Sequence, residues 1–394
     1  MGGTAFVMAA TIEIDSDRTE YVNHPMRLRP ASTTIGQVIS RVALQPITPG
    51  ERGSRGYHDP FGHGAAVWDY TRWTSEEIEL GFPAAELVPS WTARTPPGSW
   101  LEVELRGRTA DGRRTRWYVM GRWAETCADI HRTSLPGQGD EDGDVAVDTL
   151  LARRPLLAFQ VRITLYGVGA SVGSVSVMAS APPGPVRSTP PGKASGVELA
   201  VPALSQRVHA GHYPQWDGGG GSWCSPSSVT MVLGFWGRGP SAAELAWVEP
   251  ADPCPAVDHA ARDTYDHSYQ GCGNWPFSVA YAGRYGLTGF VTRLRSLAEL
   301  ESFVAAGIPV ITSQSFREHE LPGAGYSTTG HIMVVAGFTA QGDVIANDPA
   351  TEGVRRIYPR AAFENVWLRG AGSGGIVYVL HPPEVPLPES DGNW

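Results

Sequence analysis

The chain has 394 residues, with 31 Lys and Arg against 40 Asp and Glu, and its formal charge at pH 7 is -9. This length accommodates two domains of ordinary size, and a hydrophobic content of 42% supplies a core for each. A negative charge with no basic run offers no electrostatic surface for phosphate backbones, so we expect no nucleic-acid partner. The 47 Gly, 32 Pro and 13 Trp predict many turns and strands rather than long helices.

The beginning of the chain bears on its location. Its first basic residue is Arg18, and the apolar stretch ahead of it is too short to cross a bilayer, so we expect no export signal and no membrane span. A cytoplasmic location is then the default. Cys254 and Cys272 bracket a short loop-rich stretch and could form a disulfide, which favours an extracellular location. Both the bridge and the compartment stay open.

Short segments of the first 180 residues alternate apolar and polar side chains. Residues 101–107 and 115–123 share this period of two, and an Asp-Gly pair between them suits a hairpin turn. Residues 157–167 and 171–180 repeat the alternation. We therefore predict an antiparallel β-sandwich domain over residues 1–180.

No persuasive catalytic set stands out in this first domain. Its tryptophans are expected in the core, although they could instead form a stacking platform for a glycan or another envelope ligand. Cys127 and His131 lie close in sequence, but Zn²⁺ needs at least three protein ligands, so we predict no metal there. The domain is therefore interpreted as a binding module at most.

A change in composition marks the domain boundary. Residues 181–198 are rich in Pro, Gly and Ser and carry almost no large apolar side chain, which is typical of a linker. We place a second domain over residues 199–385 and a tail over residues 386–394.

Cys224 provides the strongest local signal for chemistry. It follows a glycine-rich loop and directly precedes a helical pattern, in which Pro226 suits the first turn and Ser225 offers a capping oxygen. A helix N-terminus favours a thiolate, because the helix dipole and the free N–H groups stabilise negative charge. The pattern predicts a cysteine nucleophile, although a buried inert Cys under the helix has the same local sequence.

A base for this cysteine is found in the apolar segment 330–338. His331 begins that segment, and a second strand follows it after a turn. If residues 339–342 form a four-residue loop, Phe338 faces Asp343, which brings Asp348 diagonally beside His331. Asp348 then orients the imidazole, whose other nitrogen is directed at Cys224. A register shift of one would place Asn347 there instead.

Several motifs of the second domain resemble a known family. The segments VPALSQ, YPQW, WCSPSSVTMVL, GNWPFSVAYA, GHIMVVAGF and NDP are similar to the peptidase C39-like family, bacterial papain-fold relatives of the peptidases that process bacteriocin leaders. The resemblance covers roughly residues 201–380 and implies a papain-like α+β domain. In that family a Gln upstream of the nucleophile helps to bind the oxyanion, and Gln206 matches its place in the motif. The interval from Gln206 to Cys224 looks longer than is usual, so Gln215 stays open as an alternative.

These observations predict a cysteine peptidase that acts on a peptide or protein substrate through a thioester acyl-enzyme. Cys224 attacks, His331 transfers the proton, Asp348 orients His331 and Gln206 helps to hold the oxyanion. We expect no cofactor and no metal. Two alternatives stay open. The same thioester supports acyl transfer or isopeptide cleavage, and the domain could be a catalytically inactive papain-like binding protein.

Overall fold

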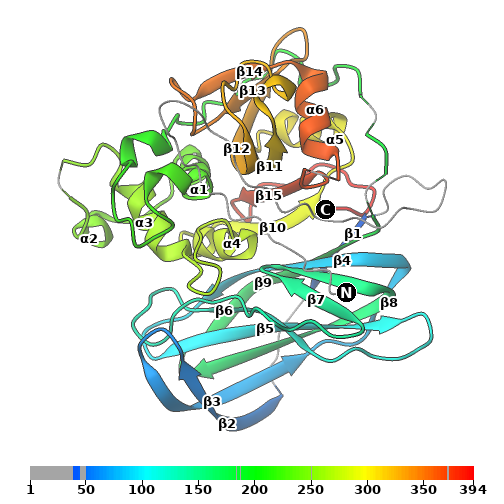
Figure 1. Ribbon diagram of the computed structural model, residues 1–394, viewed down its shortest axis with the longest axis vertical. Coiled ribbons are helices and arrows are strands. Elements are labelled where there is room, and N and C mark those ends of the chain that lie inside the picture. Colours follow the sequence, from blue (N-terminus) through cyan, green and yellow to red (C-terminus); the bar gives the residue numbers. More distant parts are fainter. Residues whose placement is uncertain (1–38, 45–49, 183, 187, 250, 371) are drawn as a thin grey trace.

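The computed structural model describes residues 39–44 and 50–394, apart from 183, 187, 250 and 371. The expectation about an export signal concerns residues outside this range. No helix in the described part of the chain is long and apolar enough to cross a bilayer. Figure 1 shows the N-terminal strands below and a mixed region of helices and strands above.

Antiparallel strands build the N-terminal half. In the described residues they form one nine-stranded hydrogen-bonded sheet with the main order β1-β9-β4-β8-β3-β2. Outside this order, β5 and β7 pair with β8, and β6 pairs with β5. The strands are β1 (Ile39–Leu44), β2 (Glu51–Asp59), β3 (Gly64–Thr74), β4 (Ile78–Arg94), β5 (Ser99–Thr109), β6 (Tyr118–Trp123), β7 (Gly143–Ala146), β8 (Thr149–Gly167) and β9 (Ser171–Ser180). The predicted strand-rich, antiparallel organisation is confirmed.

This sheet encloses its own core because β4 and β8 change partners along their length. The start of β4 pairs with β8, whereas its later residues pair with β9, so the chain passes from one layer to the other. On β5, Leu101, Val103 and Leu105 join the buried cluster, while Glu102 and Glu104 form ion pairs with arginines on the other face. The predicted hairpin is present as β5 and β6, which pair antiparallel. The alternation in the sequence therefore corresponds to an inner and an outer face.

The C-terminal half contains a second antiparallel sheet, with the order β10-β15-β11-β12-β13-β14. Its strands are β10 (Thr288–Arg293), β11 (Val310–Phe316), β12 (Thr328–Phe338), β13 (Val344–Asn347), β14 (Arg355–Tyr358) and β15 (Ile376–His381). The described helices are α1 (Cys224–Phe235), α2 (Ala242–Leu245), α3 (Pro255–Thr264), α4 (Trp275–Arg284), α5 (Leu297–Ala305) and α6 (Arg360–Leu368), with short 3₁₀ turns η1 (Gln206–His209), η2 (Gly220–Ser222) and η3 (Glu318–Glu320).

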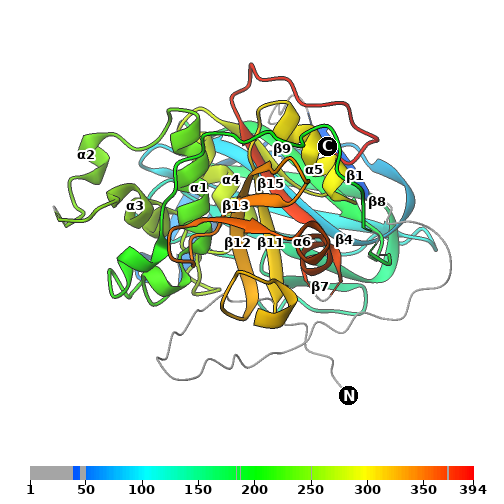
Figure 2. The same cartoon turned by 90° about the horizontal axis from the view of Figure 1, so that it is seen from above.

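Helices cover both faces of this second sheet, as Figure 2 shows from above. Alternate strand residues are divided between two clusters. Ile311, Ile332 and Val334 pack with residues of α1 and α4, whereas Val310, Met333 and Val335 pack with residues of α5 and α6. Burial on both faces explains why residues 332–338 of β12 are continuously apolar.

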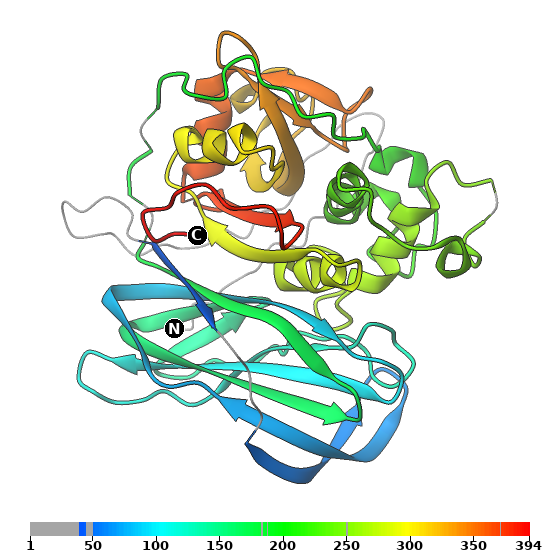
Figure 3. The same ribbon diagram turned by 180° about the vertical axis from the view of Figure 1, so that it is seen from behind.

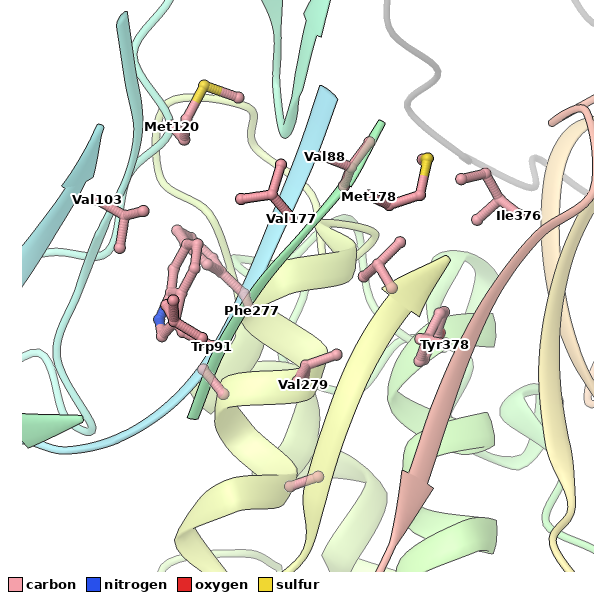
Figure 4. Packing of buried hydrophobic residues seen from close by; sticks show 14 of the residues in the cluster. Val88, Trp91, Val103, Met120, Val177, Met178, Phe277, Val279, Ile376 and Tyr378 are labelled. Atoms are coloured by element: carbon pink, nitrogen blue, oxygen red, sulfur yellow. The ribbon is translucent and has the colours of Figure 1, made fainter. Parts of the chain in front are cut away.

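The two halves share one apolar interface. Its N-terminal side is formed by β4 and β9, and its C-terminal side by α4 and β10, as Figures 3 and 4 show. The centroid of the Phe277 ring, on α4, lies 6.2 Å from the ring centroid of Trp91 and 5.4 Å from that of Trp123. Across the same interface, Arg293 of β10 forms a buried ion pair of 2.5 Å with Glu86 of β4. The N-terminal strands therefore pack directly against the half that carries Cys224.

The proline-rich segment before residue 199 lies along the C-terminal half. Thr189 donates its hydroxyl hydrogen to Glu364 over 2.8 Å, and the Gly192 N–H donates to Glu301 over 3.1 Å. At the other end of the chain, the buried Asn393 donates to the carbonyl oxygen of Arg293 over 3.1 Å.

Candidate active site

Cys224 is the first residue of α1, as the sequence predicts, and its exposed fraction is 2%. The turn η2 precedes it, and Trp223 anchors the junction by donating its indole N–H to the Trp216 carbonyl oxygen over 2.8 Å. The predicted capping role of Ser225 is wrong, because its hydroxyl contacts those of Ser278 and Tyr378 and no side chain caps the helix. The backbone N–H groups at the start of α1 are therefore not used by a side-chain cap.

His331 lies in β12, the central strand that packs against α1, and Asp348 directly follows β13. His331 Nε2 and Asp348 Oδ1 are 2.8 Å apart, and both side chains are fully buried. Nδ1, the other ring nitrogen of His331, is buried and has no hydrogen-bond partner in the described residues. Asn347, the alternative partner, instead donates to the carbonyl oxygens of Val201 and Pro202.

The register of this hairpin differs from the prediction near its loop. Phe338 pairs with Val344 rather than with Asp343, so the loop is one residue longer than expected. An irregularity between Val335 and Gly337 removes the offset, and Val334 pairs with Asn347. A β-bulge of this kind inserts one residue on one strand and restores the register beyond it. Asp348 therefore reaches His331 although the expected loop length is wrong.

Two tyrosines complete the environment of Asp348. The hydroxyl groups of Tyr326 and Tyr358 donate to Asp348 Oδ2 over 2.8 and 2.6 Å, and the Ala350 N–H donates to Oδ1 over 3.0 Å. The sequence analysis did not find these tyrosines. Tyr326 lies in the loop before β12 and Tyr358 ends β14, so no spacing within one element connects either of them to Asp348.

Burial and the carboxylate act in opposite directions on His331. Burial lowers the pKa of an imidazole, but the Asp348 charge and hydrogen bond, with a smaller contribution from Cys224, outweigh it and raise the pKa of His331 to about 10. Burial alone would raise the pKa of Asp348. The charge and hydrogen bond of His331 and the hydrogen bonds of the two tyrosines have the larger, opposite effect, so the pKa of Asp348 lies below its ordinary value. The pair is therefore an imidazolium and a carboxylate at neutral pH.

Gln206 lies in η1 and is buried. Its Nε2 donates to the Gly221 carbonyl oxygen over 2.6 Å, three residues before Cys224, and its Oε1 has no hydrogen-bond partner in the described residues. The backbone N–H of Gln206 also donates to the Pro349 carbonyl oxygen over 3.0 Å. Gln215 is exposed. Of the two glutamines, only Gln206 is held against the loop that leads to Cys224.

A cavity of about 100 Å³ brings Cys224 and His331 together. Its walls come from both halves of the chain: the C-terminal half contributes Ser222, Trp275, Asp217 and Ser373, and the N-terminal half contributes Glu86 and residues 146–149, the turn between β7 and β8. The backbone N–H of Trp275, at the start of α4, donates to Asp148 Oδ2 of that turn over 3.0 Å. The predicted site residues Cys224 and His331 thus face a space partly enclosed by the N-terminal sheet.

Two family models match the chain. One describes the peptidase C39 N-terminal domain and covers residues 31–180, and the other describes the peptidase C39-like family and covers residues 198–374. Residues 198–374 form a domain of the peptidase C39-like family. The resemblance predicted from the motifs is confirmed, and the first model adds that the N-terminal half of this C39-like protein is itself a recognised domain.

No curated protein matches the chain. A solved structure of carbohydrate-binding modules from the β-sandwich superfamily is 11% identical, covering 36% of this chain and 54% of that one, with a TM-score of 0.16. The CBM22-1–GH10 modules of Clostridium thermocellum xylanase 10B, complexed with xylohexaose, are 7% identical, covering 42% of this chain and 30% of that one, with a TM-score of 0.15. The chain therefore spans about half of the first structure and less than a third of the second.

All four cysteines of this C39-like protein are free thiols, so the disulfide that the sequence left open is not formed. Cys272 is buried and its thiol contacts the Ala261 carbonyl oxygen at 3.4 Å, while Cys254 packs beside it in the same apolar cluster. Burial raises the pKa of the Cys254 thiol to about 11. Neither Cys254 nor Cys272 lines the cavity that Cys224 and His331 share.

Proposed function

We propose that this protein is a cysteine peptidase that hydrolyses a peptide or related amide bond through a thioester. One observation carries the proposal: His331, which is paired with the buried Asp348, lines the same cavity as a cysteine at a helix N-terminus. A lone cysteine or a lone buried histidine has a structural explanation. Their convergence, together with membership of the C39-like family, supports a nucleophile and its base.

In the proposed mechanism, His331 holds the proton of the Cys224 thiol at neutral pH, and the resulting thiolate attacks the scissile carbonyl carbon. The imidazolium then donates its proton to the leaving amine as the carbon–nitrogen bond breaks. In the second half-reaction His331 takes a proton from water, whose oxygen attacks the thioester and releases the acid and Cys224. Asp348 keeps Nε2 protonated and the ring oriented throughout.

The negative charge that develops on the carbonyl oxygen needs donors close to Cys224. We assign this role to a backbone N–H at the start of α1 and to the side-chain amide of Gln206. One Nε2 hydrogen of Gln206 is held by the Gly221 carbonyl oxygen, which fixes the amide plane and leaves the second hydrogen for the oxyanion.

The finer features of the domains belong to the same proposal. A Cys on the leading helix and a His on a strand of the following sheet support a papain-like α+β arrangement for residues 199–385, preceded by a sandwich at 1–180. The turn at residues 146–149 lines the cavity, so we assign the N-terminal domain a part in shaping the substrate site. No observation here favours a glycan or envelope ligand for that domain over this role.

The test uses the full-length chain with a peptide library and mass detection of the products. Cys224→Ala is expected to abolish cleavage while its circular dichroism and unfolding midpoint stay as in the wild type. Product masses that contain water identify a hydrolase, whereas products joined to an added amine identify an acyl transferase. Cleavage by Cys224→Ala at the wild-type rate contradicts the proposal.

A second variant tests the N-terminal wall. Replacing residues 146–149 with a shorter Asn-Gly turn opens one side of the cavity without touching the triad. We expect KM and the preferred residues around the scissile bond to change, while Cys224 alkylation stays as in the wild type. An unchanged cleavage pattern overturns the assignment of this turn to the substrate site.

A further inference from the structure

Four side chains that do not line the cavity converge elsewhere in the C-terminal half. His209 ends η1, His212 follows it, Asp252 precedes α3 and Asp258 lies in the first turn of α3. One ligand atom from each lies within 4.8 Å of the others. His209 Nδ1 is 3.0 Å from Asp258 Oδ2 and 3.3 Å from Asp252 Oδ2, and His212 Nδ1 is 2.8 Å from Asp252 Oδ2.

These atoms are buried and lack hydrogen bonds. The side chains of His209, Asp252 and Asp258 have no exposed surface, and His212 is 34% exposed. In the described residues His209 Nδ1, His212 Nδ1, Asp252 Oδ2 and both carboxylate oxygens of Asp258 have no partner with hydrogen-bond geometry. Leaving a buried polar group unpaired costs about 1–3 kcal/mol, and more for a charged group. The five atoms contact one another only as His–Asp ion pairs, and a cation shared by the four side chains would give each of them a partner.

A second group in the same chain shows how a satisfied cluster differs. Asp59, His63 and His131 also lie within ligand distance of one another. There, however, the Asp59 carboxylate accepts the backbone N–H groups of Phe61 and His131, each over 2.9 Å, and contacts His131 Nδ1 at 2.8 Å. Hydrogen bonds account for that carboxylate, so proximity alone does not distinguish the first group. The unpaired, buried atoms do.

We propose that His209, His212, Asp252 and Asp258 bind one divalent transition-metal ion, with Zn²⁺ as the ion their chemistry suits best. Two imidazole nitrogens and two carboxylate oxygens form a tetrahedral ligand set, and the two carboxylates balance the charge of the ion. Zinc bonds of about 2.0–2.1 Å place tetrahedral ligand atoms about 3.3 Å apart. The four His–Asp separations, which involve both carboxylate oxygens of Asp258, are 2.8–3.5 Å, and one ligand atom from each residue lies within 4.8 Å of the others.

The ion has a structural role at this position. Four protein ligands leave no open coordination place, which is typical of structural rather than catalytic zinc. His209 is in the same turn as Gln206, and a side chain at Gly220 would clash with the backbone of both. The ion therefore fastens the segment that carries Gln206, and the loop that leads to Cys224, to helix α3. His209 and its three partners are positioning residues.

The experiment measures zinc directly in the full-length protein. The chain is treated with a chelator, dialysed and titrated with Zn²⁺ against a chromophoric competitor, and the bound ion is counted by elemental analysis. We expect about one Zn²⁺ per chain and a higher melting temperature with Zn²⁺ than without it. The same protein loaded with Co²⁺ is expected to show the intense visible absorption of tetrahedral cobalt.

Variants locate the site and separate it from catalysis. His212→Ala removes the partly exposed ligand, and the variant is expected to fold. Loss of a group that only hydrogen-bonds to a metal ligand weakens metal binding about 10–100-fold, so loss of a ligand itself should weaken it at least as much. Asp258→Asn is expected to do the same, whereas His63→Ala, in the satisfied cluster, and Cys224→Ala should bind Zn²⁺ as the wild type does. The Cys224→Ala result makes this test independent of peptidase activity. Absence of zinc uptake by the folded wild type, or an affinity for Zn²⁺ in His212→Ala and Asp258→Asn that equals that of the wild type, overturns the proposal.

Discussion

Replacing Asp348 with Asn removes the charge that keeps His331 protonated and leaves the size of the side chain unchanged. The pKa of His331 is about 10 in the protein against 6.5 for the free side chain, a difference that corresponds to about 5 kcal/mol. Without the carboxylate, burial dominates and brings that pKa below 6.5. At pH 7.5 the imidazolium fraction then falls by at least about tenfold.

The assay is the pH dependence of kcat/KM on any peptide that the library identifies. In the wild type we expect activity to persist until His331 loses its proton near pH 10. In Asp348→Asn the alkaline limb should move below pH 7, and the rate at neutral pH should fall roughly 10²–10⁴-fold, the range for general acid–base catalysis.

Tyr358→Phe is the matched control, because it removes one hydrogen bond to the same carboxylate and leaves the charge in place. Its alkaline limb should stay close to that of the wild type. If Asp348→Asn and the wild type share one alkaline limb, the carboxylate does not control His331 and the reasoning about the pair is refuted.

Three further predictions concern stability and the oxyanion. Burial raises the pKa of Asp217 from 3.8 to about 8, so between these pH values the folded state keeps a proton that the unfolded state loses, and the free energy of unfolding falls as pH rises. Asp217→Asn should make this fall less steep in urea unfolding measured from pH 4 to 9. A pH dependence in the variant equal to that of the wild type contradicts the prediction. Gln206→Ala should lower kcat by roughly 10²–10³-fold with little change in KM, because it removes a donor to the oxyanion. Gln215 is exposed, and Gln215→Ala should leave kcat unchanged. Equal values of kcat in the two variants would exclude the oxyanion role of Gln206. Phe277→Ala should lower the free energy of unfolding by about 3–5 kcal/mol, because its ring is buried between the two halves; a loss below about 1 kcal/mol would show that the interface contributes little.

Local patterns predicted the elements that carry the site. Alternation in residues 101–107 and 115–123 identified β5 and β6, and the apolar period after Cys224 identified the start of α1. The hairpin of His331 and Asp348 was also predictable, because residues on paired strands share a face at short sequence separation. These features depend on contacts within one element or between neighbouring ones.

Features that depend on remote segments were not predictable. Tyr326 and Tyr358 reach Asp348 from separate elements, and the turn at residues 146–149 lines the cavity only because the two halves pack together. His209 and His212 have a suggestive spacing, but their carboxylate partners come from a segment about 40 residues later. Tertiary packing decides all of these, and it leaves no periodic trace in one sequence.

The central claim is that His331 activates Cys224, and alkylation of Cys224 tests it most directly. Wild type, His331→Gln and Cys224→Ala are treated with a thiol-directed probe across pH, and intact mass with peptide mapping identifies the labelled cysteine. We predict rapid labelling of Cys224 well below pH 8.5, the ordinary thiol value, with loss of this rapid phase in His331→Gln. Labelling of Cys224 that follows an ordinary thiol profile, and is the same in His331→Gln, would contradict the account.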